Sequence, residues 1–546
     1  MSVKPLSPTP FLTEAFKDDG GGIDFLGLRL INLRILGQNL LPGVNNQTRD
    51  IGIFCLGVWI PWKFKQVCKS SPNDYTEANY KAFREALEVV MADGVKDGSQ
   101  ANDLFGSPNR RIGVNQDIVL PGKLAFSQDI HRTDATSLYA APLYGPSLRY
   151  LDFIGYAAGE EGKVTQIHTP SENEDTQLIC KFVDTFIGEV PLVQKISQLN
   201  FHASAEELNH LQCSGLHPQA FQNAPLEVIS ALIRHLLDTN QNEIITQRLL
   251  TTALITDTLK SIKKATYEEL IAIWHTGLIS KEVPLQLSDK RVKNQQLHWS
   301  LFETRQYQRC ILERFLIHFE QAVKVGRSSI TEITEHIIKS IKTPPKDMHT
   351  LVCHESIIAG GPPDFEKASQ WWNLNVSKDH PSSEESLWQI SESDDVEATL
   401  VMLARWILRS SPLIEQHQTL EELSWGGESR ISIRWFYNWL LNNQDRDLQD
   451  FLKELFSNLV FTQHLRVGLS RLNPNEPMQR LRFALGDLGI TPTTGMRNSL
   501  GSRDAPWMAD RLDAWLDLLA DVNIVERHQD GLISLGINAD QVTLSE

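Results

Sequence analysis

The segment "PWMADRLDAWLDLLADVNIVERHQDGLISL", from Pro506 to Leu535, has the most clearly patterned sequence in the chain. Pro506 suits the first turn of a helix. Asp530-Gly531 is a tight-turn signal, and the strand-favouring pairs Ile524-Val525 and Leu532-Ile533 flank it. The apolar residues that recur at helical spacing are Met508, Leu512, Trp515, Leu516 and Leu519. The segment therefore predicts a helix followed by a β-hairpin.

The residues before this segment extend the prediction. Met478–Leu488 has a helical pattern, and together with the segment it gives the order helix, loop, helix, hairpin. This order is typical of a winged helix, a relative of the helix-turn-helix. We therefore predict a winged-helix-like domain over residues 464–546.

The charges of this domain leave its partner open. The final helix carries Asp510, Asp513, Asp517 and Asp521, which would repel phosphates. Residues 464–511 nevertheless hold 7 arginines and 4 acids, a net charge of +3. The candidate nucleic-acid-binding residues are Arg466, Arg471, Arg480, Arg482, Arg497 and Arg503. DNA contact through these arginines and docking to another protein both remain as alternatives.

The rest of the chain is dominated by helical patterns. We predict a mainly α, multidomain protein, with one or two short strands in residues 178–195 and a long helix over His298–Val325. The Pro/Gly-rich stretches of residues 343–383 suggest an interdomain segment. The predicted domains are 1–195 (mainly helical, with loops), 196–342 (helical), 343–383 (interdomain), 384–463 (acidic, helical) and 464–546 (winged-helix-like).

The apolar stretch Leu41–Phe64 is too short to span a membrane. Its charge-free run, Ile51–Trp62, has twelve residues, whereas a membrane-spanning helix needs about 20. Its spacing predicts a buried helix with Thr48 as the N-cap. Arg49 stands at the start of this helix, where it could cap the helix, pair with a carboxylate or bind an anion.

Composition indicates a soluble cytoplasmic protein. The net charge of −16 argues against a surface that binds nucleic acid everywhere, although a local basic patch remains allowed. Six scattered cysteines suggest reduced thiols, and MSVKPLSPTP at the N-terminus has no apolar core of a signal peptide. Residues 384–450 contain 13 acidic and 5 basic residues, a net charge of −8, so a basic partner or a solvated helix face is expected there.

Two groups of residues are candidates for metal chemistry. His202, His210, Cys213 and His217 have spacings that could surround zinc, but no close pair of cysteines supports them. Asp152 followed by Glu161-Gly162-Lys163 resembles the carboxylates and lysine of a magnesium-dependent nuclease, in a glycine-rich context typical of a turn. We expect no bound cofactor, with zinc and magnesium as the alternatives to test.

No phosphate-binding, dinucleotide-binding or serine-hydrolase motif occurs in the chain. ATP-driven motors, dinucleotide enzymes and lipase-like hydrolases are therefore not expected. The sequence does not assign any other reaction.

Several short motifs stand out: Leu41-Pro42-Gly43, Thr48-Arg49, Trp59-x-Pro61-Trp62, "QHLRVGLSRL" (463–472) and "WLDLLADVNIVE" (515–526). They resemble an uncharacterised bacterial protein family that is often encoded in phage-defence islands. The similarity is patchy, and Ile53, Cys55 and Leu56 stand where that family has aromatic residues. The resemblance implies a context, a multi-gene system that acts on foreign DNA, and no particular reaction.

Two hypotheses about function follow. The first is a non-enzymatic scaffold or adaptor subunit of a bacterial anti-phage complex, which contacts other protein subunits and, as a further alternative, DNA. The second is a metal-dependent nuclease or other hydrolase of such a system.

Overall fold

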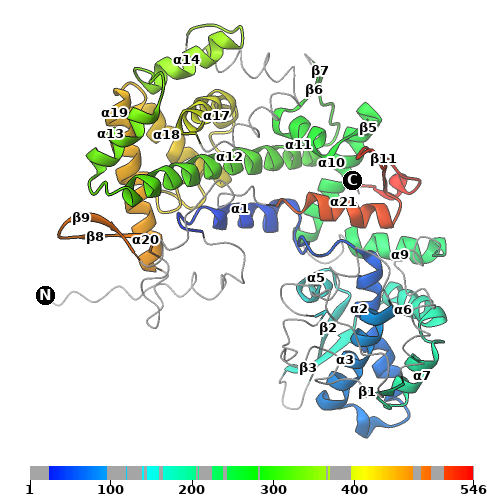
Figure 1. The fold of residues 1–546 in the computed structure, drawn as a ribbon. Coiled ribbons are helices and arrows are strands. Elements are labelled where there is room, and N and C mark those ends of the chain that lie inside the picture. The colour runs from blue at the N-terminus through cyan, green and yellow to red at the C-terminus, as the bar shows by residue number, and fades with distance from the viewer. Residues whose placement is uncertain are drawn as a thin grey trace, which may run out of the picture.

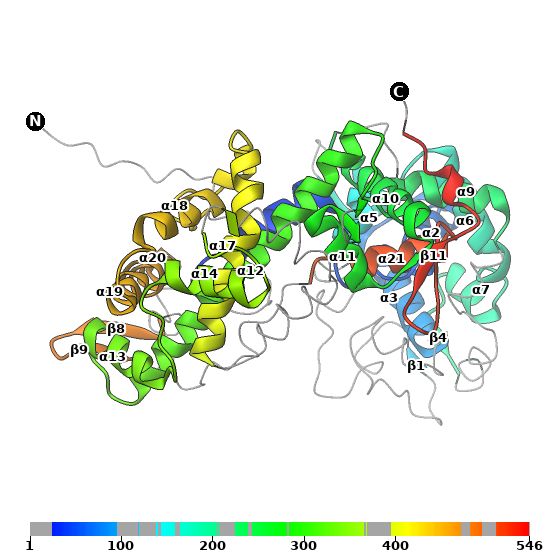
Figure 2. The same cartoon turned by 90° about the horizontal axis from the view of Figure 1, so that it is seen from above.

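The protein is mainly helical and consists of two lobes joined by one long helix (Figures 1 and 2). The computed structural model describes residues 24–94, 118–119, 138–139, 144–158, 164–204, 207, 224–237, 243–280, 283–364, 367–368, 395–470, 481–493 and 509–544. The buried apolar residues fall into two clusters, one in each lobe. None of the described helices is long and apolar enough to cross a membrane.

The first lobe is built around α2 (Ile51–Val67), most of whose side chains are buried. The predicted helix is confirmed, but its N-cap is different: the Asp50 carboxylate accepts a hydrogen bond from the Gly52 N–H at 2.7 Å. Thr48 is buried, and its hydroxyl instead bonds the backbone of Asn45, which closes the preceding turn. Asp50 therefore supplies the negative charge at the helix N-terminus.

The other elements of this lobe cover α2. The prediction of strands in residues 178–195 is wrong, because these residues lie in two helices, whose apolar faces pack inward, and in the turn between them. The helices are α3 (Glu77–Gly94), α5 (Gly145–Tyr150), α6 (Glu174–Phe186), α7 (Pro191–Ser197) and α9 (Leu226–Leu237), with a 3₁₀ turn at Pro72–Asp74. The strands form two antiparallel pairs: β2 (Ile154–Ala158) with β3 (Val164–Pro170), and β1 (Ile118–Val119) with β4 (His202–Ala203).

The second lobe packs around α12 (Lys290–Lys324), the predicted long helix, which is 35 residues long and spans about 52 Å. Its buried face is rich in polar groups that bind neighbouring backbone. Arg305, for example, donates to the carbonyls of Ile431 and Arg430. The surrounding helices are α13 (Ile330–Ser340), α14 (Met348–Ile358), α17 (Val396–Gln416), α18 (Ile433–Asn443), α19 (Leu448–Glu454), the π-helix Leu455–Thr462 and α20 (Gln463–Ser470), with a 3₁₀ turn at Glu421–Ser424. Helix α1 (Arg29–Ile35) and its π-helical continuation Leu36–Leu40 also pack on α12, but their buried apolar residues belong to the cluster of the first lobe.

The expected helix over Met478–Leu488 is wrong. The described part of this segment contains β8 (Phe483–Gly486), which pairs with β9 (Gly489–Pro492) in a hairpin. Phe483 is buried against Phe319 of α12, so tertiary packing selects the strand. The hairpin projects from the second lobe, at the opposite end of the molecule from the C-terminal helix α21 (Leu512–Asp521) (Figure 1).

The C-terminal segment returns to the first lobe and completes a small helical unit there. The predicted helix and hairpin are present as α21, β10 (Val525–Arg527) and β11 (Ile533–Leu535). Their partners are α10 (Glu243–Ile262), β5 (Lys264–Ala265) and α11 (Tyr267–Thr276). The three strands form one antiparallel sheet in the order β10-β11-β5. A short pair, β6 (Leu278–Ser280) with β7 (Val283–Pro284), and a 3₁₀ turn at Ala539–Gln541 complete the described elements.

The two clusters do not follow the predicted domain boundaries. One cluster joins the first lobe to residues 512–533, and the other joins residues 25–28 to residues 301–490. The predicted boundary between residues 342 and 343 falls inside the second cluster, because α14 packs on α17. The predicted interdomain segment thus contains a packed helix.

Candidate functional site

The row of aspartates on α21 forms a charged contact with segments that are distant from it in the sequence. Arg49, which precedes α2, places its guanidinium 2.5 Å from the Asp513 carboxylate and 3.0 Å from that of Asp517. Arg527 of β10 reaches the same two carboxylates, at 2.8 Å for Asp513. Of the three roles that the sequence allows for Arg49, the structure shows pairing with carboxylates. The two carboxylates lie 464 and 468 residues further along the chain.

The two paired carboxylates respond differently to the same arginines. Burial alone would raise both pKa values, but hydrogen bonds from Arg49 and Arg527 hold the pKa of Asp513 below its usual range. Asp517 is more buried, and there burial outweighs the two arginines and raises its pKa. Both side chains retain some exposure, 40% for Asp513 and 26% for Asp517, so each ion pair contributes only about 0.2–1 kcal/mol.

The third aspartate of the row, Asp521, lies at the N-terminus of α2. Its carboxylate accepts a hydrogen bond from the Ile51 N–H at 2.9 Å. Asp50 caps the same helix end, and the Tyr144 hydroxyl accepts hydrogen bonds from the N–H groups of Arg49 and Asp50 at 3.2 and 3.3 Å. Burial, together with the nearby Asp50, raises the pKa of Asp521 to about 8.

The inner face of α21 is fixed by hydrogen bonds and apolar packing. The Trp515 indole N–H donates to the Thr252 hydroxyl of α10 at 3.1 Å, and Trp515 is fully buried. At the start of α21, the Tyr267 hydroxyl of α11 donates to the buried carboxylate of Asp510. Burial raises the pKa of Asp510 to about 6. Helices α10 and α11 therefore hold α21 with its acidic row turned toward Arg49.

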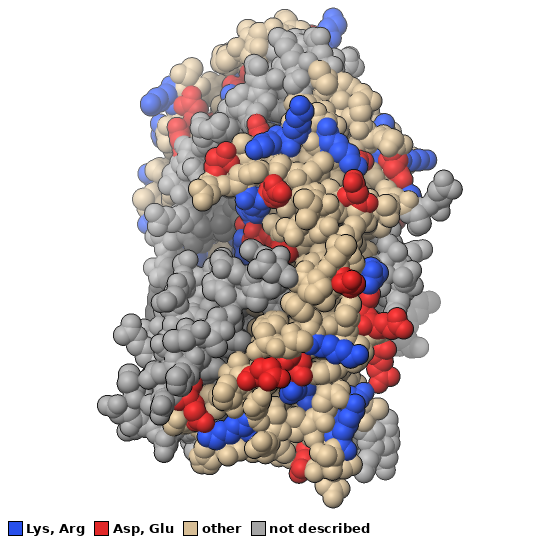
Figure 3. Space-filling view, turned by 90° about the vertical axis from the view of Figure 1, so that its right-hand side faces the viewer, with Lys and Arg blue, Asp and Glu red and all other residues tan. Residues whose placement is uncertain are grey.

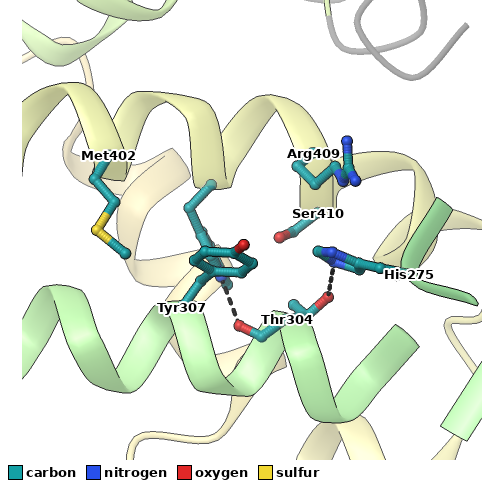
Figure 4. A pocket seen from close by; sticks show the side chains of 7 residues that line it. His275, Thr304, Tyr307, Met402, Arg409 and Ser410 are labelled. Carbon is teal, nitrogen blue, oxygen red and sulfur yellow. Dashed lines mark hydrogen bonds between the residues drawn. The ribbon is translucent and has the colours of Figure 1, made fainter. Parts of the chain in front are cut away.

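A small cavity, lined by both polar and apolar side chains, lies where α11, α12 and α17 meet (Figure 4). His275, Thr304 and Ser410 face one another across it, and the His275 ring nitrogen lies 3.4 Å from the Thr304 hydroxyl. Burial, followed by the nearby Arg409, lowers the pKa of His275 far below its usual value, so its imidazole is neutral. The cavity has room for about one water molecule. The cavity is therefore too small for an organic substrate.

The structure separates the arginines that were candidates for DNA contact. Arg482 is buried and forms a bidentate ion pair with Glu320 of α12, at 2.5 and 2.6 Å, so phosphate contact through its side chain is wrong. Arg466 is half-exposed on α20, with its guanidinium 3.6 Å from Glu428. Arg471, Arg480, Arg497 and Arg503 lie outside the described residues.

The candidate metal-binding residues are only partly described. Asp152 has a left-handed backbone (φ 55°), and its carboxylate accepts a hydrogen bond from the Ser171 hydroxyl at 2.9 Å. Its expected partners Glu161 and Lys163 lie outside the described residues. His202 is exposed on β4, whereas His210, Cys213 and His217 also lie outside the described part. Among the described residues, no three His, Cys, Asp or Glu side chains are grouped to hold a metal ion.

Sequence reasoning found the aspartate row but not its partners. From the sequence, the aspartates are expected to repel DNA. In the structure, Arg49 and Arg527 neutralise part of their negative charge. Comparisons of the chain with protein-family models, with curated proteins and with solved structures give no match. A functional interpretation therefore rests on the geometry of α21 and its neighbours.

Proposed function

We propose that α10, β5, α11, α21, β10 and β11 form a winged-helix domain that the second lobe interrupts. Along the chain these elements have the order helix, strand, helix, helix, strand, strand. Their strands make one antiparallel sheet in which β11 lies between β10 and β5. The winged helix has this order and this sheet, with the last two strands as the wing. The insertion, residues 277–511, separates the second helix from the third.

In this arrangement α21 is the third helix, the one that helix-turn-helix proteins place in the DNA major groove. Its outward carboxylates, Asp513 and Asp517, would repel phosphates. They instead contact Arg49 of the first lobe. This contact is the observation that carries the proposal, because it places the first lobe of the same chain where a duplex would lie and so argues against DNA reading by α21.

The surface charge supports the same interpretation. On the face shown in Figure 3, the Lys/Arg and Asp/Glu side chains of the described residues are interspersed, without a continuous basic stripe. A duplex needs several clustered cations to displace its counterions. The described part of this face is therefore better suited to protein contact than to DNA.

The proposed function is a non-enzymatic scaffold or adaptor subunit that joins partner proteins. The resemblance to the phage-defence family supplies the proposed setting, a bacterial anti-phage complex in the cytoplasm. Additional DNA contact through Arg466 and the arginines outside the described residues remains part of the proposal to be tested.

The test combines co-expression and DNA binding. We expect the chain to form a stoichiometric complex with proteins encoded beside it, as measured by size-exclusion chromatography with light scattering. Asp513→Asn/Asp517→Asn should weaken that complex, whereas the exposed control Arg466→Met should not. Duplex DNA, followed by fluorescence anisotropy, should bind only in the non-specific range, with Kd of about 10⁻⁴–10⁻⁶ M at physiological salt. Sequence-specific binding near 10⁻⁸ M would contradict the assignment of α21 to protein docking.

The alternative, a metal-dependent nuclease or other hydrolase, is tested separately by metal analysis. Stoichiometric zinc or magnesium together with DNA hydrolysis would overturn the non-enzymatic assignment. Loss of the metal in His202→Ala or in Asp152→Asn would then show which of the two candidate groups binds it.

A further inference from the structure

The N-terminus of α2 receives two carboxylates that come from distant parts of the chain. Asp50 caps the helix through the Gly52 N–H at 2.7 Å, and Asp521, 470 residues after Ile51, binds the Ile51 N–H at 2.9 Å. These carboxyl groups lie at the contact between the first lobe and α21, beside the apolar cluster that also joins the two. The contact therefore includes two neighbouring carboxyl groups that share one helix end.

The surroundings of Asp521 contain no cation in the described structure that is placed to neutralise it. The groups that face it are Asp50 at the α2 cap, Cys55 within α2, Tyr144 before α5, and Asp517 one turn earlier on α21. Arg49 and Arg527 bind Asp513 and Asp517 instead. Two neighbouring carboxyl groups in a part-buried site disfavour double ionisation.

We propose that Asp50 and Asp521 form a pH-sensitive latch between the first lobe and α21, which is closed while Asp521 holds a proton and is weakened when that proton leaves. A protonated carboxyl group retains a carbonyl oxygen that accepts the Ile51 N–H, and it no longer repels Asp50. This inference concerns the contact within the chain and does not depend on which partner α21 binds.

The direction of the pH effect follows from linkage. The raised pKa of about 8 for Asp521 compares with 3.8 for an ordinary aspartate, so the closed state binds one more proton than the open state between these values. The stability that this proton contributes is full below about pH 4 and is lost as the pH rises through about 8. Burial raises the pKa of Asp510 only to about 6, so measurements from pH 6.5 to 9 follow mainly Asp521, whose pKa is raised to about 8.

The experiment is hydrogen–deuterium exchange of the full chain, read in the peptide that covers residues 49–56 and corrected for intrinsic exchange. Protection should fall by up to tenfold per pH unit between pH 6.5 and 8 and become constant above pH 8. Asp521→Asn retains an oxygen acceptor but cannot ionise, so its protection should not change with pH. Asp513→Asn is the matched control on the same helix and should retain the wild-type pH dependence.

A second variant covers the case in which Asp521→Asn fails to fold. Asp50→Ser retains a capping oxygen and removes the neighbouring charge, so the loss of protection should shift to lower pH. Constant protection of the wild-type peptide from pH 6.5 to 8 would overturn the proposal. An unchanged pH dependence in folded Asp521→Asn would overturn it equally. Neither result would bear on whether α21 docks partner proteins.

Discussion

The ion pair between Arg482 and Glu320 gives the sharpest test of the second lobe. Arg482 precedes β8, and its guanidinium binds both oxygens of Glu320 on α12 at 2.5 and 2.6 Å. Only 5% and 1% of the two side chains are exposed. Removal of one partner from a buried pair leaves the other charge uncompensated, which typically costs about 3–5 kcal/mol.

For Arg482→Met we expect the lower end of that range, about 3 kcal/mol, because Lys324 also contacts Glu320 at 2.9 Å. With a urea m-value of about 3 kcal/mol/M, the unfolding midpoint of this lobe should fall by about 1 M. The assay is urea denaturation followed by circular dichroism and by the fluorescence of the buried tryptophans.

The matched control is Arg466→Met. Arg466 is 44% exposed and lies 3.6 Å from Glu428, so its loss should change the free energy of unfolding by less than about 0.5 kcal/mol. The double variant Glu320→Gln/Arg482→Met should lose less than the sum of the two single variants, because it leaves no buried unpaired charge. Equal midpoints for Arg482→Met and the wild type would refute the assignment of Arg482 to the core.

Three further outcomes are expected. Trp515→Ala should destabilise the unit formed by α10, α11 and α21 by about 3–5 kcal/mol, measured as earlier urea unfolding, because it removes a fully buried indole and its bond to Thr252; a loss under 1 kcal/mol would argue against this packing. Gly145→Ala should destabilise the first lobe, because the added Cβ would lie 1.9 Å from the Tyr139 carbonyl oxygen. The measurement is the melting temperature, which should fall. Gly37→Ala is the control, because a Cβ at Gly37 would meet no atom within 4 Å. Arg49→Ala should lower stability by at most about 1–2 kcal/mol at low salt, with a smaller difference in 1 M NaCl, because its partners are part-exposed; a loss independent of salt would contradict an electrostatic role.

Local sequence determined the elements whose pattern was strong. The helical spacing after Asp50, the long apolar periodicity of α12, and the turn signal Asp530-Gly531 each specify a structure through interactions within a few residues. The winged-helix prediction came from the same local signals at the C-terminus. The sequence also identifies the aspartates of α21, because charged residue types are read directly from the sequence.

The partners of these elements were decided by the tertiary structure alone. The strand at Phe483 replaced an expected helix because Phe319 and α12 offer it a buried site that no local pattern records. The helices that pack on α21 precede it by more than 230 residues, with a complete lobe between them. Arg49 meets Asp513 only because one cluster of buried residues brings these two parts of the chain together. Periodicity carries information over a few turns, whereas an ion pair or a sheet depends on distances in space, and only the folded chain sets those.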